Sequence, residues 1–268
     1  MTDAEGLRGV VSTGTLWASE ATALNDAREV SYGIDVAKTV LTKRTKMAID
    51  SPYEKALLRY LRDVSLAPEG MRWKTSPFVI SFCHKVTRSG QWLHYGRSGR
   101  GVAIGFDPRG LDLTGRPPEN SFDLIRIDYS PKSQRARIES MIDEGRTFVD
   151  RVGETDNNIT VTASYVAFFL GLVASHMKHP SFKEENELRL IGFEPLEGGK
   201  RFGANRSPTK FRMSNDRLIP YKALDFKPSS IKEVVIGYSS PLSQEAVRTF
   251  LAEHNVEARV TRSKVPVR

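Results

Sequence analysis

Two glutamates and an arginine alternate in the segment KEENELRLIGFEP. If NELRLIGF is a β-strand, its two-residue period places Glu185, Glu187 and Arg189 on one face, opposite the leucines. Two carboxylates beside a guanidinium are costly to bury. This face is therefore either a solvated strand start or a site for a cationic or polyhydroxyl ligand.

A second polar cluster lies in the segment SGQWLHYGRSGRG, where Trp92, His94 and Tyr95 stand between glycines. An indole, an imidazole and a phenol in one short turn could stack on a planar ring and bond a ribose hydroxyl. The structural alternative is a turn that anchors the chain to the protein surface.

A third cluster, ALNDAREVSY, contains Asn25 and Asp26 at an expected helix start, with Glu29 in a capping-box position. Helix capping is a sufficient explanation. Together with Glu185 and Glu187, however, Asp26 and Glu29 could also supply the oxygen ligands that a hard metal cation prefers.

Other chemistry-bearing residues are weaker candidates. His176 and His179 could share a helical face, but no third ligand stands out nearby, so capping or solvated histidines are expected. Cys83 lies in an apolar run and is expected to be a packed thiol. The chain has no GxxxxGK[ST] phosphate loop and no HExxH motif.

Positive charge is concentrated in the C-terminal third of the chain. Residues 178–268 carry 17 basic and 11 acidic residues, whereas residues 1–177 carry 23 and 21. The segment of about 196–216 is rich in glycine and polar residues and is expected to be a basic flexible loop. If it contacts nucleic acid phosphates, the candidates are Lys200, Arg201, Arg206, Lys210 and Arg212.

Composition indicates a soluble globular protein. The chain has 268 residues, 39% of them hydrophobic and 27% charged, with a formal net charge of +8. Its longest apolar run, YVAFFLGLVASHM, falls short of the ~18–20 residues of a membrane span and predicts a buried helix. A single cysteine and no export signal favour a cytoplasmic location with no membrane partner.

Helix and strand patterns mix without a regular βαβ repeat, which predicts one compact α+β domain over residues 1–268 with a mixed central sheet. Strands are expected near 76–84, 101–107, 121–129, 186–193, 209–213 and 218–224, and long helices near 26–46, 131–150 and 158–178. The C-terminal segment IKEVVIGY…PLSQEAVRTFLAEHN…VEARVTRS predicts a strand–helix–strand unit with parallel strands.

In its sequence motifs the chain resembles a bacterial family, domain-of-unknown-function family 2971. Its members share a G-x-L-x-x-S start, a W-x-H-Y centre followed by G-x-x-I-x-F-D, and a K-x-x-x-F-x-x-E-x-E-x-R segment. GTLWAS, WLHY with GVAIGFD, and KHPSFKEENELR match these patterns. In the family's F-N-D-P-x-E segment, which is LNDARE here, Leu24 replaces the usual aromatic residue and Ala27 replaces the proline. The family's first strand has no counterpart ahead of the helix expected near Ala4.

The layout is also similar to the ADP-ribosyltransferase superfamily, whose compact α+β domains bind nicotinamide adenine dinucleotide (NAD) and carry an E-x-E pair on a late strand. This resemblance implies that Glu187 stabilises a ribosyl cation and that Glu185 orients or deprotonates the acceptor. It also implies that Trp92 or Tyr95 stacks on nicotinamide and that His94 bonds a ribose hydroxyl. Asn25 and Asp26 would contribute to the NAD site, and either Arg189 or a residue of the basic loop would hold the pyrophosphate.

The expected function is thus that of an NAD-dependent ADP-ribosyltransferase-like bacterial effector of the toxin or phage-defence type, with RNA or DNA among its candidate acceptors. Two alternatives stay open. One is a metal-dependent nuclease or phosphoesterase, and the other is a non-catalytic module that binds nucleotides or nucleic acid.

Overall fold

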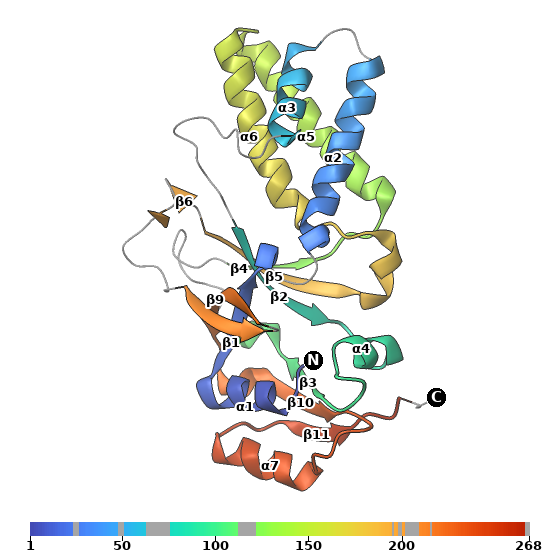
Figure 1. Ribbon diagram of the computed structural model, residues 1–268, viewed down its shortest axis with the longest axis vertical. Helices are drawn as coiled ribbons and strands as arrows, with labels where there is room; N and C mark the ends of the chain where they lie inside the picture. The colour runs from blue at the N-terminus through green and yellow to red at the C-terminus, as the bar shows by residue number, and fades with distance from the viewer. Residues whose placement is uncertain are drawn as a thin grey trace.

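The computed structural model describes residues 1–23, 27–47, 51–62, 76–111, 122–194, 196–197, 200–201, 209–214 and 216–265. Helices and strands mix along the chain and build three stacked regions (Figure 1). A helical bundle lies at one end, a six-stranded sheet lies in the middle, and a three-stranded sheet lies at the other end with α1 (Ala4–Thr13) and α7 (Gln244–Glu253). The expected α+β class is confirmed.

The bundle begins from local signals that are visible in the sequence. The Ser51 hydroxyl accepts a hydrogen bond from the Glu54 amide at 3.3 Å, and Pro52 occupies the first helical position, as expected for a capped helix start. Leu57 is fully buried, which stabilises the fold by about 1.5–3 kcal/mol. The bundle helices are α2 (Ala27–Met47), α3 (Pro52–Arg62), α5 (Pro131–Val152) and α6 (Asp156–Ala174).

Helix α6 corresponds to the longest apolar run. By length and composition alone it could cross a membrane. It packs into the bundle core through Ile159, Ala163 and Leu170, while Tyr165 and Phe169 on its other side are exposed. The expectation of a helix that packs into the protein core is thus met on one face of α6.

Every pairing in the six-stranded sheet is antiparallel. One face of this sheet carries Phe78, Leu190 and Leu224, which share an apolar cluster with Val234 and Ile236 of the smaller sheet. The strands lie in the order β4 (Phe122–Arg126), β5 (Glu187–Glu194), β2 (Ser76–Cys83), β1 (Thr15–Glu20), β9 (Arg217–Asp225) and β8 (Lys210–Ser214).

The two halves of this sheet are joined over a short register. Strand β2 pairs with β5 along its whole length, but its register with β1 comprises the pairs Ser19↔Val79 and Glu20↔Phe78. Beyond these pairs β1 and β2 diverge (Figure 1). The part of β2 that follows Val79 therefore has a side that β1 does not cover.

The smaller sheet has the order β11 (Arg259–Arg262), β10 (Ile231–Ile236) and β3 (Val102–Phe106). Strands β10 and β11 are parallel and α7 connects them, so the predicted strand–helix–strand unit is confirmed. Strand β3 pairs with β10 in the antiparallel sense, so the mixed pairing occurs in this sheet.

Several short helices and strands connect the main elements. Gly14 ends α1 in the left-handed region, with φ 63°, where glycine has no steric penalty. The other short elements are α4 (Ser89–His94), η1 (Ala21–Ala23), η2 (Pro108–Gly110), η3 (Pro180–Glu185), η4 (Pro228–Ser230), β6 (Leu196–Glu197) and β7 (Lys200–Arg201).

Two local expectations are corrected. Glu185 is not on the strand, because η3 ends at Glu185 and Asn186 turns the backbone with φ 45° before β5 begins at Glu187. The basic segment of about 196–216 is not a continuous loop in its described part. It contains β6, β7 and the edge strand β8, because Lys210 to Ser214 pair with β9.

Candidate functional site

The paired carboxylates meet on the side of the six-stranded sheet that faces the bundle. Glu187 and Arg189 lie on β5, and each is about 5% exposed. The Arg189 guanidinium donates two hydrogen bonds to the Glu187 carboxylate, Nε to Oε1 at 2.7 Å and Nη2 to Oε2 at 3.0 Å. A third donor, Nη1, bonds the Ser175 carbonyl at the end of α6 at 3.2 Å. This bidentate pairing compensates two buried charges.

The surroundings of Glu187 favour its ionised form. Burial alone would raise the pKa of its carboxyl, but the charge and hydrogen bonds of Arg189, a hydrogen bond from Ser81 and the charge of Lys178 together lower that pKa. The Glu187 amide also donates to the Tyr129 hydroxyl at 3.1 Å. Both carboxylate oxygens thus have partners, and Glu187 is anchored rather than exposed to a ligand.

Lys178 connects the two carboxylates. Its side chain is 4% exposed, and its ammonium group forms a short ion pair with Glu185 and lies 3.5 Å from Oε2 of Glu187. The same ammonium lies 5.0 Å from the ring centroid of Phe182, within the range of a cation–π contact. Two carboxylates and two cations therefore share one network without a net charge.

Hydrogen bonds from the bundle position Lys178. The Lys178 amide donates to the Asp128 carbonyl at 3.1 Å, and the fully buried Gln134 amide group donates to the carbonyls of both Asp128 and Lys178. The Gln134 oxygen accepts from the Tyr32 hydroxyl of α2 at 3.0 Å. The site therefore rests on both the sheet and the bundle.

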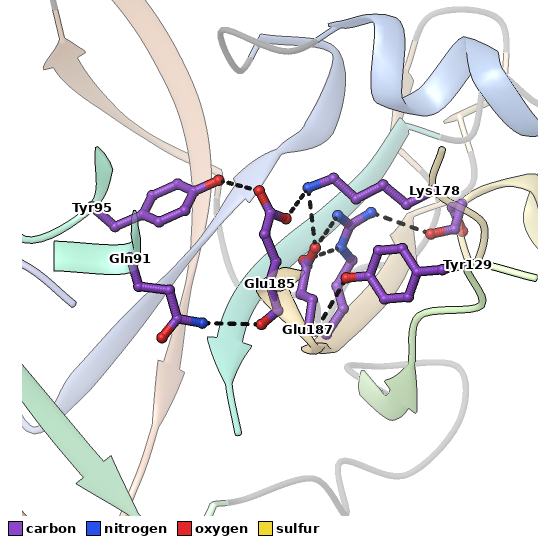
Figure 2. A network of polar contacts seen from close by, with 8 residues as sticks. Gln91, Tyr95, Tyr129, Lys178, Glu185 and Glu187 are labelled. Carbon is purple, nitrogen blue, oxygen red and sulfur yellow. Dashed lines mark hydrogen bonds and ion pairs between the residues drawn. The ribbon is translucent and has the colours of Figure 1, made fainter. Parts of the chain in front are cut away.

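Glu185 is the carboxylate at the surface of this network. Its side chain is 20% exposed, compared with 6% for Glu187. The Tyr95 hydroxyl donates to it at 2.8 Å, and the Gln91 side chain donates to its backbone carbonyl at 3.0 Å. Figure 2 shows Gln91 and Tyr95 on one side of Glu185 and Lys178 on the other. The arrangement presents an oriented anion beside an exposed phenol ring.

The structure brings Tyr95, Glu185, Glu187 and Arg189 together, but it does not place Trp92 with them as a ligand-stacking ring. Trp92 is fully buried, its indole N–H donates to the Val86 carbonyl at 2.7 Å, and its ring packs with Ala103 and Val235. The assignment of Trp92 to a nicotinamide site is therefore withdrawn, because its ring has no exposed face.

The remaining expected site residues are more dispersed. His94 is exposed, with its ring centroid 6.5 Å from that of Tyr95. Asn25, Asp26 and Arg206 lie outside the described residues, as do the side chains of Lys200 and Arg201 on β7. Lys210 is exposed on β8, and Arg212 of the same strand donates to the Ser19 hydroxyl at 3.2 Å.

In the described ranges, no three histidine, cysteine, aspartate or glutamate side chains come together as metal ligands. His179 caps η3 by accepting from the Ser181 amide at 3.2 Å. Burial and the nearby Arg137 and Arg189 charges lower the pKa of His176 to about 4, although Asp123 opposes this shift. Burial also raises the pKa of the Cys83 thiol, as expected for a packed cysteine.

Sequence reasoning missed four residues near this site: Lys178, Tyr129, Gln91 and Ser81. A signal existed for Lys178, because it is the first residue of the K-x-x-x-F-x-x-E-x-E-x-R pattern and Phe182 is the second. Gln91 lies on α4, Ser81 lies on β2 and Tyr129 follows β4. Only tertiary contacts link these three residues to the carboxylates.

Comparison with known proteins connects this network to one family. Residues 91–190 match the model of a protein family of unknown function, DUF2971. The match covers this central segment, which is therefore similar to DUF2971 proteins. No curated protein and no solved structure matches the chain significantly. The DUF2971 region runs from Gln91 to Leu190 and so contains Tyr95, Tyr129, Lys178 and both carboxylates.

Proposed function

We propose that this protein is an NAD-dependent ADP-ribosyltransferase-like enzyme with Glu185 as its principal catalytic carboxylate. The observation that carries the proposal is the position of Glu185, which Lys178 and Tyr95 hold at the edge of a buried, charge-compensated network. A carboxylate fixed before substrate arrives can stabilise a cation that forms in the transition state without first reorganising.

The proposed chemistry separates the roles of the two glutamates. Cleavage of the nicotinamide–ribose C–N bond leaves its electron pair on nicotinamide and develops positive charge on the ribose. Glu185 faces that charge, while an acceptor oxygen or nitrogen forms the new bond to the ribose carbon and passes its proton to a base. Glu187 is a positioning residue, because Arg189 and Lys178 already engage its carboxylate.

The exposed side chains of the site are available to contact the substrate. The Tyr95 ring is 54% exposed and adjoins Glu185, which suits it to stack on the nicotinamide ring. His94 lies beside Tyr95 and is exposed, so it is placed to bond a ribose hydroxyl. These two residues keep the roles expected from the sequence, whereas the Trp92 role is dropped.

A nucleic acid acceptor and a cytoplasmic toxin or phage-defence role complete the proposal. The net charge of +8 and the basic residues after Lys178 favour a polyanionic acceptor. A metal-dependent nuclease is less well supported, because the cations beside Glu185 and Glu187 are the protein's own Lys178 and Arg189.

Release of nicotinamide from NAD tests the proposal, with Glu185→Gln compared against Glu184→Gln. Glu184 is the adjacent residue, its side chain is 84% exposed, and it pairs with Arg88, so it is a matched control for loss of one charge. We expect E185Q to lose about 10²–10³-fold in rate and E184Q to keep near-normal turnover. Full turnover by E185Q would remove the assigned role. Nuclease or phosphodiesterase activity that requires Mg²⁺ or Mn²⁺, without any NAD turnover, would favour the rival enzyme.

A further inference from the structure

We infer that Trp17 and Arg212 form a nucleotide-binding surface on the bundle-facing side of the six-stranded sheet, with the planar base on Trp17 and the phosphate at Arg212. The inference rests on the proposed function and deepens it, because it places a second part of the substrate.

Trp17 is an exposed aromatic ring with a rigid backing. It lies on β1, it is 46% exposed, and it stacks on Tyr221 of β9 with ring centroids 4.6 Å apart and an interplanar angle of 29°. Tyr221 is 8% exposed. One face of the indole is therefore supported and the remainder faces solvent, as in the stacking platforms of proteins that bind single nucleotides or unpaired bases.

Arg212 supplies a cation beside this ring pair. It lies on β8, two strands from β1, and its guanidinium reaches the Ser19 hydroxyl at 3.2 Å. Ser19 pairs with Tyr221 in the β1–β9 register, so the guanidinium lies over the strands that carry the stacked rings. Within the described part of the chain this contact is with a neutral hydroxyl, which leaves the guanidinium charge suited to a phosphate.

The register places this surface on the same face as the carboxylate network. Ser81 pairs with Arg189, and Val79, two residues earlier on β2, pairs with Ser19. Because side chains alternate along strands, Trp17, Ser19, Ser81 and Arg189 share one face of the sheet. Ser81 is exposed and follows Val79 on β2, beyond the residues that pair with β1.

These positions define the ligand by its chemistry. A planar base stacked on Trp17 with its phosphate at Arg212 would lie over β1 and β9, on the face of the sheet that also carries the exposed Ser81 hydroxyl and Glu187. A nucleotide has a stacking ring, a polar sugar and an anionic phosphate, so it matches the three kinds of group on this face. Because the proposed function stacks nicotinamide on Tyr95, the base on Trp17 is the adenine half of a dinucleotide, and separate mononucleotides test this assignment.

The test is the binding of adenosine monophosphate, nicotinamide mononucleotide and NAD to the full chain, measured by calorimetry and by quenching of tryptophan fluorescence. The variants are Trp17→Ala, Trp17→Phe and Arg212→Gln, with Phe148→Ala as a control at a different aromatic residue that is 51% exposed on the bundle. Loss of one base-stacking contact should weaken binding of the stacked mononucleotide by about 5- to 150-fold in W17A. W17F and F148A should stay close to wild type, and R212Q should weaken mononucleotides but not the corresponding nucleosides.

The outcomes separate this inference from the proposed function. Unchanged affinity in W17A with an unchanged melting temperature overturns the platform, whatever the catalytic result, and so does a wild-type chain that binds none of the three nucleotides at millimolar concentrations. Conversely, nucleotide binding that depends on Trp17 without any NAD turnover retains the platform and removes the transferase. If W17A unfolds, comparing W17F with Trp17→Leu serves the same purpose. Phenylalanine keeps an aromatic face for the base, whereas leucine fills the space without one.

Discussion

Tyr95 and Glu185 are ninety residues apart in the sequence, and their side chains meet in a hydrogen bond of 2.8 Å. The contact joins the turn after α4 to the end of η3, immediately before the strand that carries Glu187 and Arg189. It also links an exposed ring of the candidate site to the more exposed of its two carboxylates.

Tyr95→Phe should show whether the orientation of Glu185 matters for catalysis, because the change hardly affects the stability of the fold. The change removes only the hydroxyl at a half-exposed position, so we expect the free energy of unfolding to fall by no more than about 0.5–1.5 kcal/mol. If the hydroxyl orients Glu185 for catalysis, nicotinamide release should fall while the melting temperature hardly changes. A Y95F variant with wild-type turnover would show that the hydrogen bond is not needed for the reaction.

Glu187→Gln should destabilise the fold. The change leaves Arg189 and Lys178 buried with one fewer negative partner, and breaking a buried ion pair costs about 3–5 kcal/mol. Urea denaturation of E187Q against E184Q measures the difference. A double variant, E187Q with Arg189→Gln, should recover part of the loss, and strictly additive effects would contradict direct coupling of this pair.

His176 should make stability depend on pH in the mildly acidic range. Its folded pKa of about 4 lies below the ordinary value of 6.5, so the unfolded chain binds more protons between these values. Stability is then complete above about pH 6.5 and falls as the pH drops toward about 4, by on the order of 1–2 kcal/mol after allowance for solvent at the half-buried ring. His176→Gln should remove this slope in denaturation curves recorded between pH 4 and 7, whereas an unchanged slope would assign it to another group. The lowered pKa of Glu187 acts at lower pH, because its contribution is lost only as its carboxylate becomes protonated.

Nucleic acid binding, if it occurs through the basic segment, should depend steeply on salt. Replacement of Lys200, Arg201 and Arg206 by alanine should reduce the slope of log affinity against log salt by up to about three units, because each phosphate contact contributes ~0.7–0.9. Fluorescence anisotropy with RNA and DNA measures this slope. The matched control replaces three exposed basic residues of α5: Lys132, Arg135 and Arg151. Equal slopes for the two triple variants would contradict a specific role for the basic segment.

The sequence by itself determined the elements whose signals are local. Gly14 ends α1 and Ser51 caps the start of α3, and the alternating and helical patterns after Ile231 form the parallel strand–helix–strand unit that was predicted. Hydrophobic period, capping side chains and glycine conformations act over a few residues, so a single sequence reveals them. The E-x-E-x-R spacing likewise identified Glu185, Glu187 and Arg189 as neighbours.

Only the tertiary structure decided how these residues divide their roles. The turn at Asn186 moved Glu185 off the strand and toward Tyr95, and burial beside Lys178 and Arg189 made Glu187 an anchor. Packing also decided that Trp17 is exposed and Trp92 is buried, because a ring's burial depends on the elements that cover it. Trp92 lies inside an apolar cluster, whereas Trp17 stands on a sheet face with Tyr221 behind it. Such relationships join segments far apart in the chain, and no local pattern in one sequence encodes them.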